Sequence, residues 1–193
     1  MKQTMSARRA RGFMAAAGAG LALAVSAVAW AQTFQPARSS VVATFRQMNV
    51  PIDAPFKTFR AQVAFDPAKP AEGKGTVEID VASLDLGEAD FNAEVRRKAW
   101  FDAATHPKAT FVVNGGAKAA GPNRFEVPGK LTIKGRTIDV VAPVTVRNEG
   151  NVQLFEGQVP IKRLAFNIGE GEWKDTSLVA DEVIVKFRIA TAR

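Results

Sequence analysis

The chain has 193 residues, with 26 lysines and arginines against 19 aspartates and glutamates, and it contains no cysteine. Without cysteine it cannot form a disulfide, a zinc–thiolate site or a thiol nucleophile, and no lipid can be attached to a cysteine behind an export signal. No sustained stripe of basic residues is present, which excludes the usual kind of nucleic-acid-binding surface.

Residues 1–31 have the three-part anatomy of a secretory signal peptide. Their four basic residues are followed by the apolar run 13–29, which ends in the Ala-Trp-Ala cleavage pattern at 29–31. The run is short and rich in alanine, and no cluster of charges follows it. We therefore predict cleavage before Gln32 rather than a retained membrane anchor.

Residues 32–193 hold 22 basic and 19 acidic residues, a net charge of about +3, and are long enough for one domain with a hydrophobic core. Within them, eight segments alternate between apolar and polar residues with a period of two, which is typical of strands with one buried face. The eight predicted strands are residues 40–47, 57–66, 76–81, 109–113, 124–134, 137–147, 152–163 and 181–189.

Short turns join most of these strands, with Lys134-Gly135 as a predicted tight hairpin turn. Strands joined in this way run antiparallel, because parallel strands need long crossover connections. Eight antiparallel strands in a chain of this length form either a barrel or a sandwich, and the pattern alone leaves both open. An eight-stranded barrel is wide enough to hold one small ligand.

One segment, residues 88–99, has the periodicity of a helix instead. Apolar residues recur there every four positions and form a narrow stripe. Asp85 followed by Glu88 has the spacing of a capping box, which predicts where the helix begins. Trp100 and Phe101 follow directly, so we expect the helix to cover one end of the sheet and to be fixed there by these two rings.

Catalytic and metal chemistry find little support in the sequence. The single histidine, His106, precedes a proline in a predicted loop, and no recognisable motif places a nucleophile and an acid with it. No calcium-loop or phosphate-loop spacing is present, and the Gly-Glu-Gly sequence at 169–171 lacks the third glycine of a nucleotide-binding fingerprint. We therefore expect no catalytic residue and no metal site, and we interpret His106 as a solvated loop residue.

Residues 32–193 contain twelve phenylalanines, two tryptophans and no tyrosine, so nearly all of their aromatic rings lack a polar group. Most of the phenylalanines lie on the apolar faces of predicted strands, and small residues share those faces. Such a mixture either packs into a solid core or lines a hollow interior, and the sequence leaves both open.

Arg163 is the most informative polar residue, because it lies on the apolar face of the predicted strand 152–163. A charge in that position must be paired with an acid, exposed at a rim, or offered to a ligand. The two interpretations are an ion pair with Asp181 or Glu182 and a contact with the polar end of a bound lipid.

Several short segments are recognisable by their order and spacing, although none is specific alone. They are residues 65–67 with 77–80 and 82–85, residues 100–102 with 107–111, residues 129–135, and residues 163–169 with Trp173. Through them the chain resembles the YceI-like family of exported bacterial proteins over about residues 39–189. Many members carry a histidine near the position of Gln47 or Asn49, which is absent here, so no role is carried over for it.

The resemblance implies an eight-stranded, antiparallel, lipocalin-like barrel in which the helix covers one end. It also implies a periplasmic, non-enzymatic protein that binds polyisoprenoid lipids, such as quinones or prenyl phosphates, without a further cofactor. Transient contact with a membrane would accompany that function, and a dimer is compatible with it. From the strand faces and the family segments together, the predicted apolar lining is Phe45, Phe59, Phe91, Trp100, Phe101, Phe111, Leu131, Phe155, Ile161, Phe166, Trp173 and Phe187, with Arg163 as the contact for a polar head group.

Two alternatives to a lipid carrier remain open from the sequence. One is an enzyme that modifies an isoprenoid head group with the help of Arg163. The other is a protein-interaction module with a solid core. The presence or absence of an internal cavity separates the solid-core module from the other two.

Overall fold

Residues 32–192 are described by the computed structural model, so the predicted signal peptide, residues 1–31, lies outside the described residues. The strands are β1 (Thr33–Phe34), β2 (Ser40–Gln47), β3 (Val50–Pro55), β4 (Phe59–Ala64), β5 (Lys74–Asp80), β6 (Lys108–Asn114), β7 (Lys118–Gly121), β8 (Arg124–Ile133), β9 (Arg136–Glu149), β10 (Val152–Lys162) and β11 (Val179–Ala192). The α-helix is α1 (Ala89–Val95), and short 3-10 helices are η1 (Pro36–Arg38), η2 (Pro70–Glu72), η3 (Val81–Ser83), η4 (Arg163–Phe166) and η5 (Gly171–Lys174).

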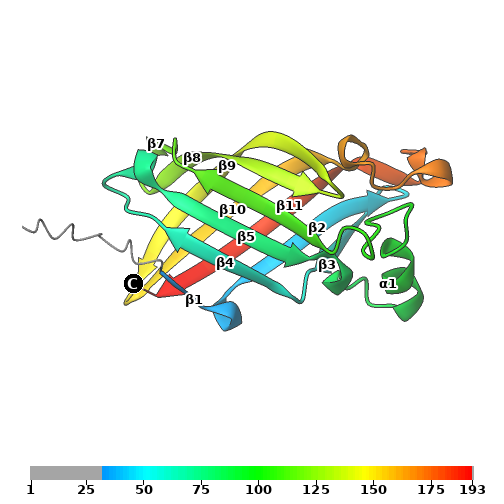
Figure 1. Cartoon of the computed structure of the whole chain (residues 1–193), viewed down its shortest axis with the longest axis horizontal. Helices are drawn as coiled ribbons and strands as arrows, with labels where there is room; N and C mark the ends of the chain where they lie inside the picture. Colours follow the sequence, from blue (N-terminus) through cyan, green and yellow to red (C-terminus); the bar gives the residue numbers. More distant parts are fainter. Residues whose placement is uncertain (1–31, 193) are drawn as a thin grey trace, which may run out of the picture.

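The strands form one strongly curled antiparallel sheet in the order β3-β2-β11-β10-β9-β8-β6-β5-β4 (Figure 1). Strand β1 joins β4, which is one end of this path, to β11 near the other end. That strand pairs with β11, and Gln32 just before it forms a bridge with Val63 of β4. The choice between barrel and sandwich is thereby settled, and the predicted lipocalin-like barrel is confirmed.

Each predicted strand is present, and three further short strands were not predicted. The sequence of β3 contains Pro51 and Pro55, which interrupt the alternation and are tolerated because β3 is an edge strand. All four residues of β7 are exposed, so its sequence lacks the alternation of apolar and polar residues from which the eight strands were predicted. The hairpin turn at Lys134-Gly135 is confirmed, and both of its residues have positive φ, of 47° and 72°.

The helix is shorter than predicted and begins without a capping box. It covers Ala89–Val95, and its N-cap residue Glu88 makes no side-chain hydrogen bond. The Asp85 carboxylate instead accepts from the Gly87 amide at 2.9 Å and from Asn92 Nδ2 at 3.2 Å. The carboxylate that the predicted capping box required is therefore hydrogen-bonded within a local turn instead. Residues 96–101 continue as turns.

The helix nevertheless lies at one end of the barrel, as predicted, and the loops on either side of η4 and η5 lie at the same end (Figure 1). Phe101 packs edge-on against Phe56, with ring centroids 6.4 Å apart. The opposite end holds β1 and the C-terminus. We call these two ends the helix end and the far end.

Two glycines in the wall make room for large rings inside the barrel. A Cβ at Gly129 would lie 2.5 Å from the ring of Phe111, and a Cβ at Gly157 would lie 2.6 Å from Cζ of Phe187. Glycine within a strand commonly marks such a close approach. The rings of β6 and β11 therefore lie against the wall instead of across the lumen.

Candidate functional site

The interior of the barrel contains two cavities. The far cavity has a volume of about 160 Å³ and the helix-end cavity about 260 Å³. A cavity of roughly 150 Å³ with aliphatic and aromatic walls stays dry and accepts an apolar molecule. The alternative of a solid-core interaction module, which required a barrel without a cavity, is therefore not supported.

The two cavities adjoin, and we call the region where their walls share residues the waist. Four aliphatic side chains, one from each of β5, β8, β10 and β11, belong to the walls of both cavities. They are Ile79, Leu131, Ile161 and Val185. A long, flexible, apolar chain could thread this arrangement, whereas a compact polar molecule would find few partners in it.

Ten of the twelve predicted lining residues border a cavity. The helix-end cavity is bordered by Phe45, Phe91, Trp100, Phe101 and Trp173, the far cavity by Phe111, Phe155 and Phe187, and both by Leu131 and Ile161. Their positions follow from the period-two alternation of the strands and from the loops that close the helix end.

The other two predicted lining residues border neither cavity. Phe59 packs against Phe34, with ring centroids 5.8 Å apart, and so contributes to the closure by β1. Phe166 is only 1% exposed and packs in a cluster with Ile161 and Ile168, which border the helix-end cavity although Phe166 does not. The sequence list also left out lining residues that share the predicted apolar faces or precede them, namely Phe56, Phe65 and Phe125.

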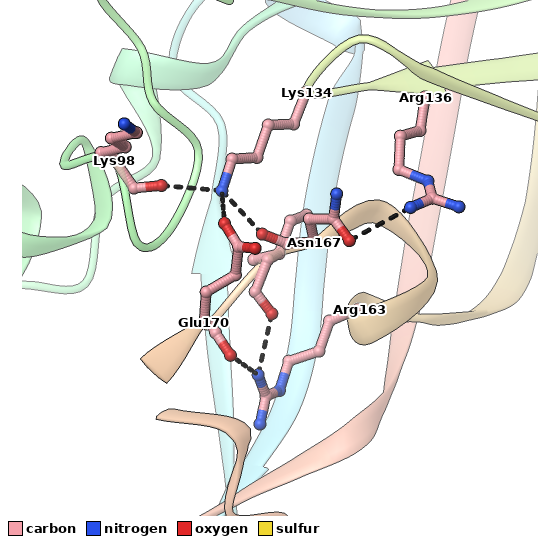
Figure 2. Close-up of polar contacts among 8 residues, drawn as sticks. Lys98, Lys134, Arg136, Arg163, Asn167 and Glu170 are labelled. Carbon is pink, nitrogen blue, oxygen red and sulfur yellow. Dashed lines mark hydrogen bonds and ion pairs between the residues drawn. The ribbon is translucent and has the colours of Figure 1, made fainter. Parts of the chain in front are cut away.

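Arg163 is buried, with 2% of its surface exposed, but it is not part of a strand. Strand β10 ends at Lys162, and Arg163 begins η4. All five of its N–H groups donate to main-chain carbonyl oxygens (Figure 2 shows two of these bonds). The acceptors are Ala180 at 3.1 Å, Ile168 at 2.8 Å, Gly169 at 3.2 Å, Trp173 at 2.7 Å and Val179 at 2.7 Å.

These five bonds overturn both partners predicted for Arg163. The Asp181 carboxylate accepts the Leu164 amide at 3.0 Å, and Glu182 pairs with Lys162 at 3.8 Å. Guanidinium has five N–H donors, so none is left for a lipid head group. The enzyme interpretation relied on that head-group contact. Burial lowers the pKa of Arg163, and the charge of Asp181 partly opposes this shift.

The function of Arg163 in the fold is to hold the segment 163–180 over the helix-end cavity. Gly169 is adapted to it, because its φ is +78° and a Cβ there would lie 2.0 Å from Arg163 Nη1. The guanidinium carbon also lies 5.8 Å from the ring centre of Trp100, within range of a cation–π interaction. Trp100 and Trp173, 5.3 Å apart, thus form a fixed aromatic part of the cavity wall.

Lys134 forms a second tie at the same end, and its side chain is only 8% exposed. Its Nζ donates to the carbonyls of Lys98 and Asn167, both at 2.7 Å, and to Glu170 at 2.9 Å (Figure 2). The neighbouring ammonium lowers the pKa of Glu170. The sequence had indicated Lys134 only as a turn residue. It joins the β8–β9 turn to the segment after α1 and to the loop around η4.

Few polar groups face the cavities. The charged residues that border the helix-end cavity are Arg163 and Glu94, and Glu94 pairs with Arg97 at 2.8 Å. Lys74 is the one charged residue among those bordering the far cavity. The indole nitrogen of Trp100 is the one buried side-chain polar atom within residues 32–192 that lacks a hydrogen-bond partner.

No group of three or more metal-ligating side chains occurs in the described part of the chain. His106 is half-buried rather than fully solvated, because its ring packs beside Gly135. None of the helices within residues 32–192 has the length and hydropathy needed to cross a bilayer.

A sequence profile of the YceI-like domain matches residues 32–191. Among solved structures, the crystal structure of BcnA from Burkholderia cenocepacia is 53% identical and aligns with 82% of this chain and 99% of that chain, with a TM-score of 0.80. A polyisoprenoid-binding domain from Saccharophagus degradans, implicated in plant cell wall breakdown, shares the fold at 17% identity. Its TM-score is 0.68, over 83% of this chain and 98% of its own.

Curated relatives match over shorter stretches. The UPF0312 protein of Azotobacter vinelandii is 32% identical over 119 residues, which are 58% of this chain and 62% of that protein. The UPF0312 protein of Pseudomonas syringae pv. syringae is 34% identical over 99 residues, or 51% of each chain. The chain therefore spans between about half and three-fifths of these relatives.

Proposed function

Because this chain belongs to the YceI-like family, we propose that it is a periplasmic carrier that holds the tail of an isoprenoid lipid inside its barrel. The observation that carries the proposal is the pair of adjoining apolar cavities, with four aliphatic side chains at their shared waist. The neighbour from Saccharophagus degradans, a polyisoprenoid-binding domain, supports it.

The energetics of an isoprenoid tail suit such walls. Burial of one CH₂ group is worth about 0.8 kcal/mol, so a five-carbon unit gains roughly 4 kcal/mol before costs. Loss of translational freedom and ordering of the tail offset several kcal/mol of this gain. A few buried units suffice for useful affinity without any polar contact. Recognition would then follow the length and shape of the tail, and no catalytic group is needed.

An uncharged head group, such as a quinone ring, fits the helix-end cavity better than a phosphate does. All five N–H groups of Arg163 are already bonded to carbonyls, and the other charged residue on that wall, Glu94, would repel an anion. A buried phosphate without paired donors would be strongly destabilised. We therefore propose neutral prenyl lipids as the ligand class.

The decisive experiment begins with protein purified from its native periplasm, organic extraction and mass spectrometry. We expect a prenyl lipid in near-stoichiometric amount. If none is found, and if neither a prenyl quinone nor a prenyl phosphate of equal tail length binds when added, the carrier proposal is wrong. Tighter binding of the phosphate than of the quinone would refute only the preference for a neutral head group.

A single substitution tests whether the tail passes the waist. Ile161, which borders both cavities, is changed to tryptophan, and the control is Val141→Trp on the outer face of β9. We expect Ile161→Trp to lower the affinity for a long-chain prenyl quinone by at least about tenfold, because the larger ring fills the passage. The affinity of the control should be unchanged. Equal affinities for the two variants would show that the tail does not occupy the waist.

A further inference from the structure

Large apolar side chains gather, exposed, around the mouth of the helix-end cavity. Within residues 32–192, six large hydrophobic residues are exposed, and four of them belong to the helix end. Met48 is 67% exposed and Val50 61%, both at the turn between β2 and β3; Phe91 on α1 is 58% exposed, and Leu178 just before β11 is 44% exposed. We call these four residues the apolar rim.

The members of the apolar rim come from three separate segments that meet at the cavity. The Met48 amide donates to the Leu178 carbonyl at 2.9 Å, which joins the β2–β3 turn to the start of β11. Phe91 itself borders the helix-end cavity, as do the chain neighbours Gln47 and Val179. The rim is therefore continuous with the apolar interior. Figure 1 shows α1 and the β2–β3 turn at the same end of the barrel.

Such an arrangement differs from the scattered exposed hydrophobic residues of an ordinary surface. A turn needs no methionine at its tip, and Met48 has a φ of +47°, a conformation that favours glycine or asparagine. Apolar side chains at the mouth of a cavity are unfavourable while they are exposed to water. They are therefore typical of a surface that another molecule covers when the protein functions.

The chemistry of the rim favours a lipid bilayer as the surface that covers it. A prenyl lipid is insoluble and resides in a membrane, so an apolar rim that continues into the cavity lets the tail enter without crossing water. Strand pairing with a second copy is disfavoured, because the exposed edge strand β3 carries Pro51 and Pro55. Around Phe91, residues 88–98 contain three acidic and three basic side chains, so no net positive charge there points to anionic lipids.

We propose that the apolar rim, formed by Met48, Val50, Phe91 and Leu178, inserts into the outer part of a lipid bilayer and places the mouth of the helix-end cavity against it. This inference rests on the proposed lipid-carrying function. Because hydrocarbon contact supplies the affinity, docking occurs on uncharged bilayers and depends little on salt.

Vesicles of phosphatidylcholine alone provide the probe, with binding of the purified protein measured by co-sedimentation. The rim variant carries Met48→Ser, Val50→Ser and Leu178→Ser, and it leaves Phe91 unchanged because that residue also borders the cavity. The control carries Val112→Ser and Val141→Ser, which are 41% and 57% exposed on the barrel wall. We expect the rim variant to bind vesicles at least about tenfold more weakly than the unmodified protein and the control to bind as it does. Added salt should change binding less than about twofold.

A second measurement keeps docking separate from the cavity. A prenyl quinone with a few isoprene units, kept below its solubility limit, is titrated against all three proteins in the absence of vesicles. We expect equal affinities, since the substituted side chains lie at the surface. If the unmodified protein binds this quinone but not the vesicles, or if the rim variant binds vesicles normally, the docking proposal is overturned while the carrier function stands. If no protein binds the quinone, the proposed function itself fails.

A third outcome identifies another occupant of the rim. Analytical ultracentrifugation is performed on the unmodified protein and the rim variant at the same concentrations. A dimer that the rim substitutions dissociate, together with no binding of phosphatidylcholine vesicles, would assign the rim to contact between copies and would refute docking on a bilayer. Unchanged thermal unfolding confirms that the serine variants retain the fold.

Discussion

The two ends of the barrel are closed by different means. At the far end, strand β1 and the short side chains of neighbouring strands form the closure. Gln32 Nε2 donates to Gln153 at 2.8 Å, and the Thr191 hydroxyl donates to Gln32 at 2.9 Å. Gln153 and Thr191 are fully buried. Each contact there joins residues that the sheet register already brings together.

At the helix end the closure consists of loops, and each loop is bound by a long cationic side chain. Arg163 donates to five carbonyls between residues 168 and 180, and Lys134 donates to Lys98 in the segment after α1 and to the loop that follows η4. These loops carry the tryptophan pair and Leu178 of the apolar rim. The comparison indicates that the far end contributes only to the stability of the barrel, whereas the helix end contributes to stability and also controls access to the interior.

The largest expected effect is that of Arg163→Ala, which removes the main tie of the helix end. It leaves five carbonyl oxygens without their donor, and we expect a loss of about 4 kcal/mol or more in the free energy of unfolding. Urea denaturation measures it. The matched control is Arg136→Ala, whose one hydrogen bond to Asn167 is exposed and 3.2 Å long. It should cost less than about 1 kcal/mol. Similar losses in both variants would contradict the assigned function of Arg163.

A smaller loss is expected from Gln153→Leu at the far end. The substitution removes the acceptor of the Gln32 amide and the donor to Asn148 at 3.3 Å. We expect destabilisation by about 2 kcal/mol in urea, because buried polar groups lose their partners. The affinity for a prenyl quinone should be unchanged. A Gln62→Leu control on the exposed face of β4 should unfold like the unmodified protein. If Gln153→Leu instead weakens quinone binding, the division between the ends is wrong.

The smallest effect concerns the pH dependence of the helix end. The Lys134 ammonium lowers the folded-state pKa of Glu170 below its ordinary value of 4.5. The contribution of the Lys134–Glu170 pair to the free energy of unfolding is therefore complete above about pH 4.5, and it is lost as the pH falls through the lower folded-state pKa of Glu170. We expect Glu170→Gln to flatten this part of the stability profile, measured by urea denaturation between about pH 5 and 3. An unchanged slope would show that the pair contributes nothing.

Much of the barrel could be predicted from period-two alternation, because each long strand has one face toward the lumen. The exceptions have local causes. The prolines of β3 and the uniformly exposed residues of β7 conceal those strands. The capping box had correct spacing, but Asp85 is bound in its own turn. Alternation also located most of the lining residues, since a residue on the inner face of a barrel strand has little else to border.

The polar ties of the helix end could not be predicted in the same way. The apolar register of β10 was extended one residue too far, and this placed Arg163 on a strand face instead of at the start of η4. Its partners are main-chain carbonyls, which every residue possesses, so no sequence pattern identifies them. The contacts of Lys134 could not be predicted for the same reason. Phe166 shares the apolar character of lining residues and packs with some of them, but it does not border the cavity.

The wall glycines set the calibre of the lumen. Gly129 and Gly157 accommodate the rings of Phe111 and Phe187, and those rings border the far cavity of about 160 Å³. A methyl group at either position would force the facing ring inward or push the strands apart. The width of the lumen thus depends on having glycine, which has no side chain, at these two positions as much as on the residues that line it. Relatives with alanine or larger residues at these positions are expected to accept thinner or shorter cargo.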